Sequence, residues 1–479
     1  MRFPLALTAK IAGHIIKHKL ARTPKFAMVL QLEPLHTCNL TCTGCGRIRE
    51  YSTNLKDMMS LEDCLAAANE CDAPMVSVCG GEPLIYPKIE ELVVGLREQG
   101  RIIYVCTNGM FMRKKMKDYM AAHYGPRMEL KVVQLLKDKL ITDKDAEVIR
   151  KADDKARARV TIKPSRWMYW NVHVDGLEYT HDLIVEREGV FKECIEAIKM
   201  AKVLGYQVAT NTTVYKETDV KELEDMFAFL SSLEVDGHTI SPGYDYDAAK
   251  KDMVKRLGKD PKDFFLTRDL TRKKFKKIEE WGERFTIFGT PVYQEFLAGK
   301  RELTCTAWAI PTRNIRGWKA PCYLMTDGHY AGYHEMLEKV DWNKYGVVNG
   351  IARDPRCENC LVHCGYDPSG ALGTNYQRGD NWKNLKYNFS PKPQPYRPGA
   401  KVQAFNGVSV GKGHLAPAEA ALRTAGLSQE GADTEFYVRQ MQASGPLEAN
   451  SDAKSSSCSS GDTSQRDELQ GKTGSARKN

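Results

Sequence analysis

The sequence predicts an α/β fold in which strands and helices alternate around a parallel sheet, open or closed into a barrel. Two observations predict this class. Between residues 27 and 245 the hydrophobic pattern changes repeatedly from short buried runs to the period of about 3.6 residues that is typical of helices. The chain also has 479 residues, of which 42% are apolar, which is enough for two or three units with a buried core.

The expected elements follow one another in regular order. Ser60, with Asp63 three residues later, resembles a capping box that opens a helix. Ile89, Leu92 and Val93 share one face of the next helix. We expect strands at 27–33, 74–79, 101–106, 170–175, 206–214 and 237–241, and helices at 60–70, 87–98, 191–204 and 220–230.

Changes in composition divide the chain into four regions. The first, 1–26, is basic and amphipathic; it is either a helix packed on the domain or an interfacial membrane anchor. The core spans 27–245 and includes a charged, helical insertion at about 122–160. A Cys-rich C-terminal domain occupies 246–385. The last region, 386–479, has few large apolar residues towards its end, so we expect it to be mostly disordered.

The net charge is mildly basic, because 70 Lys and Arg face 61 Asp and Glu, a difference of +9. The basic residues form no stripe interleaved with aromatics, so we expect no nucleic-acid partner. No run approaches the roughly 18 apolar residues of a membrane span, and we do not expect residues 1–26 to act as a signal peptide, because their apolar stretch is short and interrupted and lacks a small-residue cleavage site. We expect a cytoplasmic location, where the fourteen cysteines are metal ligands or buried thiols.

Three cysteines follow the first expected strand on one short loop. Cys38, Cys42 and Cys45 have the spacing C-x3-C-x2-C. Three thiolates at this spacing can hold three irons of a [4Fe–4S] cluster and leave the fourth iron open. A structural zinc site needs four ligands, and a ferredoxin-type cluster needs a fourth cysteine. His36 is a candidate fourth ligand, so zinc is the alternative.

Polar groups follow the ends of the later strands. Gly80 and Gly81 permit close approach of backbone to a ligand, and Glu82 can accept an ammonium group. A Gly-Gly-Glu-Pro run is also compatible with an ordinary turn. The carboxyl ends of parallel strands meet at one edge, where functional groups gather. The other candidates at this edge are Cys106, Asn108, His173, Asp175, Asn211 and Thr213.

The cysteine triplet together with residues 80–83 resembles the radical S-adenosylmethionine (SAM) superfamily, over about residues 27–245. The resemblance implies a partial (β/α)6 barrel, here with a Cys-rich C-terminal extension and a disordered tail. It implies a [4Fe–4S] cluster and SAM as cofactors, with a reductase or flavodoxin-type electron donor. Many members carry an aromatic residue before the third cysteine, where this chain has Gly44. The SAM-binding residues that the resemblance implies are Gly80, Gly81, Glu82, Asn108, Asp175, Asn211 and Thr213.

Further runs, including 174–177, 305–311 and 363–366, are similar to the adenosylhopane synthase (HpnH) family of hopanoid biosynthesis over roughly residues 5–370. This similarity implies that the 5′-deoxyadenosyl radical adds to the terminal alkene of diploptene, a pentacyclic triterpene, and forms adenosylhopane. The tertiary carbon radical that results must then gain a hydrogen atom. A lipid substrate would also give the amphipathic N-terminus a purpose at a membrane surface.

Cys106 is the candidate donor of this hydrogen atom. It ends an expected strand at the active end of the barrel, and a thiol S–H bond is weak enough to quench an alkyl radical. The alternative is a small buried residue, which is the commoner role of a free cysteine.

A second group of cysteines lies in the C-terminal domain. Cys357, Cys360 and Cys364 have ligand-like spacing, and Cys305 and Cys322 precede them. The group predicts a second metal site, iron–sulfur or zinc, and leaves free thiols in a compact lid as the alternative.

Two other functions compete with the lipid reaction. A radical SAM enzyme that modifies a peptide or protein often carries a Cys-rich auxiliary domain, and it would abstract a hydrogen atom instead. A zinc-binding interaction module would have no catalytic activity and would not cleave SAM.

Overall fold

The computed structural model describes residues 2–51, 54, 56–348, 350–391 and 393. The chain divides into two compact units, 1–447 and 448–479, and every described residue lies in the first. The expected disordered tail lies, from residue 394 on, outside the described residues. Across the described residues, no helix combines the length and the apolar character that a membrane crossing needs.

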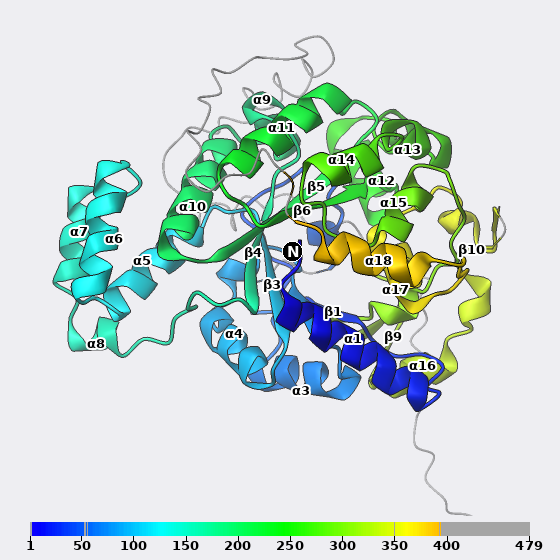
Figure 1. The fold of residues 1–479 in the computed structure, drawn as a ribbon, viewed down its shortest axis with the longest axis horizontal. Coiled ribbons are helices and arrows are strands. Elements are labelled where there is room, and N and C mark those ends of the chain that lie inside the picture. The colour runs from blue at the N-terminus through cyan, green and yellow to red at the C-terminus, as the bar shows by residue number, and fades with distance from the viewer. Residues whose placement is uncertain (1, 52–53, 55, 349, 392, 394–479) are drawn as a thin grey trace, which may run out of the picture. The chain divides into compact units, whose positions relative to one another are not determined.

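Six parallel strands lie side by side in sequence order, as in a partial (β/α)6 barrel (Figure 1). The predicted α/β class with a parallel sheet is confirmed. Each strand lies within two residues of its expected bounds, because each is a short apolar run between turn residues. The strands are β1 (Val29–Leu32), β2 (Met75–Val78), β3 (Ile102–Thr107), β4 (Met168–His173), β5 (Gln207–Val214) and β6 (Gly237–Pro242).

The expected helices between the strands also form. The hydroxyl of Ser60 accepts a hydrogen bond from the backbone N–H of Asp63 at 3.0 Å, which caps the first of them. Ile89, Leu92 and Val93 are buried against the sheet. These helices are α3 (Leu61–Cys71), α4 (Ile89–Glu98), α10 (Val190–Leu204) and α11 (Val220–Ser232), with the short α9 (Glu178–Ile184) before α10.

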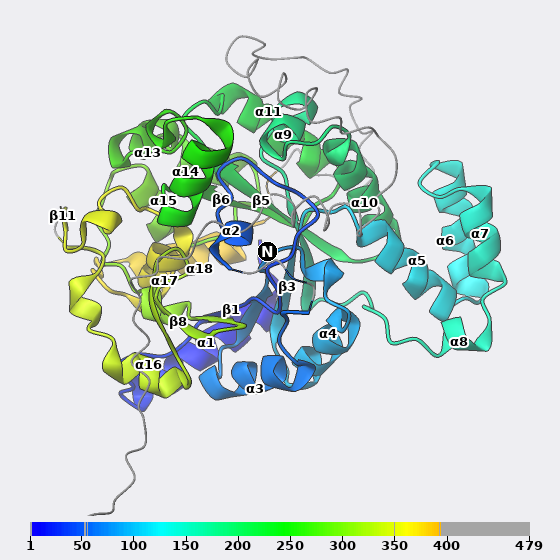
Figure 2. The same ribbon diagram turned by 180° about the vertical axis from the view of Figure 1, so that it is seen from behind.

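The charged insertion is helical and stands to one side of the barrel in both views (Figures 1 and 2). Val132, Leu135 and Ile149 in it are buried and belong to the same apolar cluster as the barrel core. Its surface carries many charged residues but also exposes Leu130 and Val148. Its helices are α6 (Pro126–Lys137), α7 (Asp143–Arg150) and α8 (Asp154–Arg157), joined to β3 through α5 (Met112–Ala122).

Different segments cover the two ends of the barrel. Helices α1 (Leu5–Leu20) and α18 (Asp380–Phe389) cross the end that faces the viewer in Figure 1. The loop after β1 and the short α2 (Arg47–Glu50) cross the opposite end, at the carboxyl ends of the strands (Figure 2). The N-terminal helix is therefore packed on the domain, with Leu7 fully buried, although Leu5, Ile16 and Leu20 on it are exposed.

The C-terminal region adds strands and short helices that the sequence analysis did not predict. Strand β7 (Thr312–Asn314) pairs with β1, and the antiparallel β8 (Gly317–Pro321) and β9 (Thr326–Tyr330) extend the sheet. Helix α18 runs past the expected boundary at 385. The remaining elements are α12 (Asp247–Asp252), α13 (Arg268–Lys274), α14 (Ile278–Arg284), α15 (Pro291–Leu297), α16 (Tyr333–Lys339) and α17 (His363–Leu372), with β10 (Val347–Val348) and β11 (Ile351–Ala352).

Candidate functional site

The three cysteines of the first group lie on the loop between β1 and α2, at the carboxyl end of the barrel (Figure 2). Cys38 is buried, and Cys42 and Cys45 are half-buried. A hydrogen bond of 3.1 Å from the Cys45 N–H to the Cys42 carbonyl closes the turn between them. Burial raises the pKa of all three thiols, so a metal must displace their protons in order to bind.

Gly80 and Gly81 let the cysteine loop pass directly against the end of β2. A Cβ on Gly81 would stand 2.0 Å from the carbonyl oxygen of Thr37. One on Gly80, whose φ is +110°, would stand 2.2 Å from the carbonyl oxygen of Leu35. The backbone N–H of Gly81 instead donates to Leu35 at 3.0 Å. We expected these glycines to let a ligand approach the backbone closely. In this structure they let the cysteine loop approach it.

Glu82 ties the ends of two strands together and is almost fully buried. Its carboxylate accepts hydrogen bonds from the Thr107 hydroxyl at 2.7 Å and from the Asn108 N–H at 2.8 Å. Burial raises the pKa of Glu82 to about 7, against the effect of these donors. The Asn108 amide donates to the Asn39 side chain at 2.8 Å and lies 3.8 Å from the Cys38 sulfur. Glu82 therefore also holds Asn108 beside the first thiol.

A second buried carboxylate joins the ends of β4 and β5. Asp175 contacts His173 Nε2 at 2.7 Å and accepts the backbone N–H of Thr213, also at 2.7 Å. Burial lowers the pKa of His173, but the Asp175 carboxylate outweighs burial and the net shift is upward. Asn211 lies half-buried on the same strand as Thr213. The structure thus places the expected SAM-binding residues at the same end of the barrel as the cysteine loop.

His36 belongs to no group of three or more described donors within 4.8 Å of one another, although its buried Nδ1 has no hydrogen-bond partner. Its Nε2 lies 3.2 Å from a carboxylate oxygen of the fully buried Glu33, and its ring stacks on Tyr51. The Arg47 guanidinium donates to the other oxygen of Glu33. Burial alone would raise the pKa of Glu33, but Arg47 and His36 hold it well below its usual range. The Glu33–Arg47 ion pair joins the residues before the cysteine loop to those after it. The sequence analysis did not predict this pair.

An aromatic ring from another part of the chain packs against Gly44, just before the third cysteine. A Cβ on Gly44 would meet the Phe264 ring at 2.5 Å. Phe264 stacks on Tyr215, with ring centroids 4.2 Å apart. Gly44 has φ +79°, so glycine suits both the turn and the contact. The expected aromatic is thus absent from the motif, and Phe264 occupies the adjoining space from a position 220 residues later.

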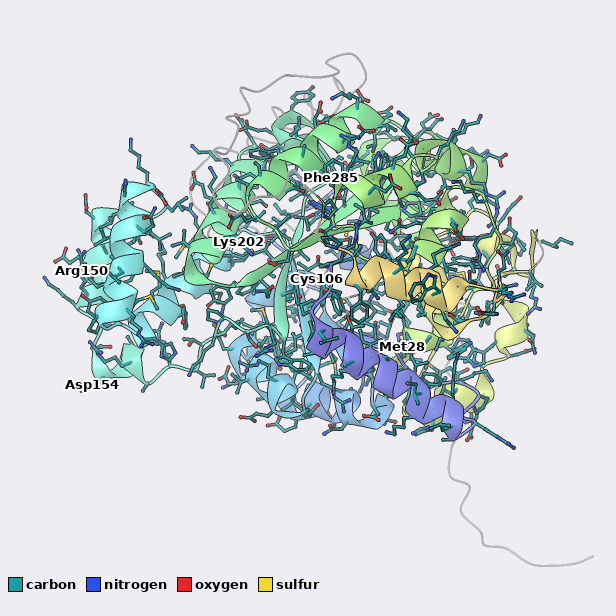
Figure 3. The ribbon with its side chains drawn as sticks, in the orientation of Figure 1. Met28, Cys106, Arg150, Asp154, Lys202 and Phe285 are labelled. Atoms are coloured by element: carbon teal, nitrogen blue, oxygen red, sulfur yellow. The ribbon has the colours of Figure 1, made fainter. Side chains whose placement is uncertain are left out.

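Cys106 lies near the centre of the barrel (Figure 3) and packs against the buried cluster that includes Tyr104 and Tyr169. Its sulfur lies 3.1 Å from the Ser77 hydroxyl and 3.4 Å from the amide nitrogen of Asn171. Burial raises the pKa of this thiol, against the effect of its two polar neighbours, so it keeps its proton at neutral pH. A protonated thiol is the form that can donate a hydrogen atom.

A cavity of about 460 Å³ extends from Ser77 and Asn171 through the interior of the barrel to α1 and α18. This volume is within the range of about 300–1,000 Å³ that is usual for small-molecule sites. Its wall is mostly apolar and includes Ile11, Met28, Tyr104, Ile240 and Phe288. The inner polar end of the cavity contacts Cys106 through Ser77 and Asn171.

The second group of cysteines also converges. Cys305, Cys322, Cys357, Cys360 and Cys364 line one cavity beside the barrel, although they are spread over sixty residues. All five are free thiols. His363, which precedes Cys364 in the chain, does not line this cavity, and its Nδ1 lies 3.1 Å from the Ser241 hydroxyl.

The first group fits an open cluster site better than a zinc ion. Among the described residues, the one group of three or more donors lying within 4.8 Å of one another is His14, His18 and Asp72, and Asp72 is already paired with Lys17 and Arg101. The cysteine triplet is therefore more widely spaced than the sulfurs of a tetrahedral zinc site, which lie about 3.8 Å apart for Zn–S bonds of about 2.3 Å.

Two family models match the chain. Residues 32–135 match the Radical SAM superfamily, and residues 238–384 match a domain of unknown function, DUF3463. No curated protein matches the chain. The first match includes the cysteine loop, Glu82 and Asn108, and the second includes all five cysteines of the second group.

Solved structures similar to the chain include two that hold S-adenosylmethionine. Streptococcus suis SuiB bound to S-adenosylmethionine is 13% identical with a TM-score of 0.41, over 64% of this chain and 62% of SuiB. Native anSMEcpe with bound AdoMet and Cp18Cys peptide is 16% identical with a TM-score of 0.41, over 75% of this chain and 96% of its own. The chain thus spans less than two thirds of the length of SuiB. Part of the chain thus matches the radical SAM superfamily, whose members bind SAM and a [4Fe–4S] cluster, and a later part matches a domain of unknown function.

Proposed function

We propose that this radical SAM enzyme adds the 5′-deoxyadenosyl group to the terminal alkene of diploptene and forms adenosylhopane in hopanoid biosynthesis. The observation that carries the proposal is the largely apolar cavity that ends at Ser77 and Asn171, the two polar neighbours of the Cys106 sulfur. A hydrocarbon substrate has no polar handle, so its site must be shaped and apolar. Addition to an alkene also depends on holding the reacting carbon close to the radical, which is a positioning effect.

The cofactors would be held at the carboxyl end of the barrel. Cys38, Cys42 and Cys45 are the ligands we assign to the cluster, and Glu82, Asn108, Asp175, Asn211 and Thr213 are those we assign to the SAM site. When bound, these cofactors supply the 5′-deoxyadenosyl radical on receipt of one electron, for which we propose a reductase or flavodoxin-type donor. The remaining work of the chain is to hold the alkene, exclude water and deliver a hydrogen atom.

We assign that delivery to Cys106. The S–H bond breaks homolytically, the hydrogen atom forms a C–H bond at the tertiary carbon of the substrate, and a thiyl radical remains on the sulfur. The thiyl returns to the thiol by taking one electron from the same donor and one proton. Ser77 and Asn171 hold the sulfur at the inner end of the cavity, 3.1 and 3.4 Å away.

The outer end of the cavity is suited to a membrane surface. Leu5, Ile16 and Leu20 on α1 and Trp382 on α18 are 56–80% exposed, and both helices line the cavity. The last turn of α1 is basic, which favours anionic lipid headgroups. We propose peripheral contact here, through which an apolar substrate reaches the cavity without crossing water.

A peptide- or protein-modifying radical SAM enzyme is the second candidate. The feature of this chain that favours it is the Cys-rich C-terminal domain, in which five thiols converge on one cavity. Such an enzyme would abstract a hydrogen atom, so 5′-deoxyadenosine would leave as a separate product. The apolar wall of the larger cavity favours the lipid instead.

One anaerobic assay separates the two candidates. The reconstituted enzyme receives SAM, a strong reductant and diploptene in detergent, and the products are analysed by mass spectrometry. The proposal expects a product whose mass is the sum of diploptene and 5′-deoxyadenosine. Free 5′-deoxyadenosine without this adduct would refute the lipid substrate and leave the radical chemistry intact. No SAM cleavage, in protein shown to hold its cluster, would refute both.

A further inference from the structure

The five cysteines of the C-terminal domain form a built site outside the radical SAM motif. Cys305 precedes β7, Cys322 follows β8, and Cys357, Cys360 and Cys364 lie before or at the start of α17. Three separate chain segments therefore bring thiols to one cavity. Its volume of about 30 Å³ is two to three times the roughly 10–15 Å³ that one water molecule needs on the same measure, so it has room for several atoms.

Two glycines allow these segments to close around the thiols. A Cβ on Gly365 would stand 2.7 Å from the Cys305 sulfur, and one on Gly346 would stand 2.8 Å from the Cys305 Cβ. The backbone N–H of Gly346 points at the Cys357 sulfur, 3.2 Å away. Backbone N–H groups directed at cysteine sulfurs are among the features that tune protein-bound iron–sulfur clusters.

The spacing of the thiols distinguishes between the candidate metals. A tetrahedral zinc ion draws its sulfurs to about 3.8 Å from one another, given Zn–S bonds of about 2.3 Å. Within the described part of the chain, no three of these five sulfurs lie within 4.8 Å of one another, and the same holds for the radical SAM triplet. A multinuclear cluster needs the wider spacing, because each sulfur binds a different iron.

A buried network of charges joins the second cysteine group to the radical SAM loop. Lys319 is fully buried, and its ammonium group donates to the Tyr323 carbonyl at 2.8 Å, next to Cys322 in the chain. The Arg47 guanidinium donates to the same carbonyl at 2.9 Å and stacks on the Tyr323 ring. Glu50 pairs with both cations and Glu33 pairs with Arg47, so the network is neutral and fixes the chain beside Cys322.

We propose that four of these five cysteines hold a second iron–sulfur cluster of the [4Fe–4S] type, fully ligated by protein. Full ligation leaves no open iron for SAM, so this cluster differs in role from the first. Arg47 follows Cys45 by two residues and stacks on Tyr323, the neighbour of Cys322. This contact links the site of the second cluster in the C-terminal domain to the radical SAM loop. The inference does not depend on which substrate the enzyme uses.

Metal analysis of a triple variant, C38A/C42A/C45A, tests the proposal. After anaerobic reconstitution we expect about four irons and four sulfides per chain to remain, with a broad absorption near 400 nm, against about eight irons in the wild type. Adding C322A, C357A and C360A, which leaves two thiols of the group, should remove the remaining iron. The matched control, C71A, removes a buried thiol outside both groups and should leave the iron content unchanged.

The outcomes are decisive without any activity measurement. A triple variant that holds no iron, or that holds about one zinc in its place, overturns the proposal. If the triple variant fails to fold, the comparison moves to the wild type and the C322A/C357A/C360A variant, which keeps two thiols of the group. Equal iron content in those two proteins would also overturn the second cluster, whereas a drop from about eight irons to about four supports it.

Discussion

At the carboxyl end of the barrel, single buried carboxylates bond to groups on neighbouring chain segments, and these bonds hold the candidate site together. Glu82 connects β2 to β3, Asp175 connects β4 to β5, and Glu33 holds Arg47 and His36 after β1. Sequence spacing was sufficient to predict the cysteines and the strand-end polar groups as candidates, because each lies next to a clear strand. It could not predict Phe264 or the Glu33–Arg47 pair, because those contacts join residues that no local pattern connects.

Replacing Gly81 by alanine should disrupt the cysteine loop. The added Cβ would lie 2.0 Å from the Thr37 carbonyl oxygen, a backbone atom that cannot move alone. We expect a loss of stability of about 1–3 kcal/mol, and a fall in reconstituted iron of at least the share held by the first cluster. The control is G125A, where nothing lies within 4 Å of the new Cβ. Normal iron and normal melting temperature in G81A would show that the contact with the loop is not tight.

Replacing Cys106 by alanine should remove the hydrogen-atom donor and leave the cluster in place. We expect iron content and SAM cleavage to be retained. The saturated adduct should fall at least tenfold, or form with mixed stereochemistry at the new centre, because quenching would come from unpositioned donors. Product yield and stereochemistry are read by chromatography and mass spectrometry, with C71A as the control. Unchanged yield and stereochemistry in C106A would reject this role.

The elements divide between a regular half that local patterns predict and an irregular half that they do not. Strands β1 to β6 and helices α3, α4, α10 and α11 are long enough to show their period, and all were expected. Strands β7 to β9 and helices α12 to α15 were missed. They are short, and Lys319, Trp318 and Asn314 are buried in β7 and β8 through ion pairs and contacts with distant residues. Tertiary contacts, which no local pattern encodes, determine these elements.

Helix α1 is held to the barrel by Asp72, and this attachment should depend on pH. Asp72 accepts Lys17 and Arg101 at 2.9 Å each, and despite burial these partners lower its pKa to about 2. A lowered carboxyl pKa contributes stability above its ordinary value of about 3.9, and this contribution is lost as pH falls toward 2. Asp72 is 46% exposed, so D72N should lower the free energy of unfolding by only about 0.5 kcal/mol at pH 7. Chemical denaturation should show the difference constant from pH 8 to 5 and shrinking below pH 4; a difference that grows on acidification would contradict this assignment.

Exposed apolar residues on α1 and α18 should carry membrane contact. We expect the L20S/W382S variant to bind anionic lipid vesicles at least tenfold more weakly than the wild type, since each large side chain contributes about 1.5–3 kcal/mol when buried. The control is L130S/V148S, which removes two equally exposed apolar residues from the insertion. Vesicle co-sedimentation measures the difference. Equal binding by all three proteins would place the contact elsewhere or exclude it.

At the scale of the whole molecule, the barrel separates two kinds of environment. The carboxyl end gathers thiols and buried carboxylates, the amino end opens to α1 and α18, and Cys106 lies between them at the inner end of the apolar cavity. The sequence predicted the parallel α/β class and the gathering of polar groups at one edge. The cavity could not be predicted, because α1, the strands and α18 supply its walls from opposite ends of the described chain.

The central claim is that the radical adds to an alkene in this cavity and that a thiol completes the reaction. The most direct measurement is the mass of the product formed anaerobically from diploptene and SAM in D₂O, where the Cys106 thiol exchanges its proton for deuterium. The account predicts an adduct about one mass unit heavier than diploptene and 5′-deoxyadenosine combined, because deuterium takes the place of hydrogen at the new centre, and this adduct should fall at least tenfold or form with mixed stereochemistry in C106A. Free 5′-deoxyadenosine with unaltered diploptene would contradict it.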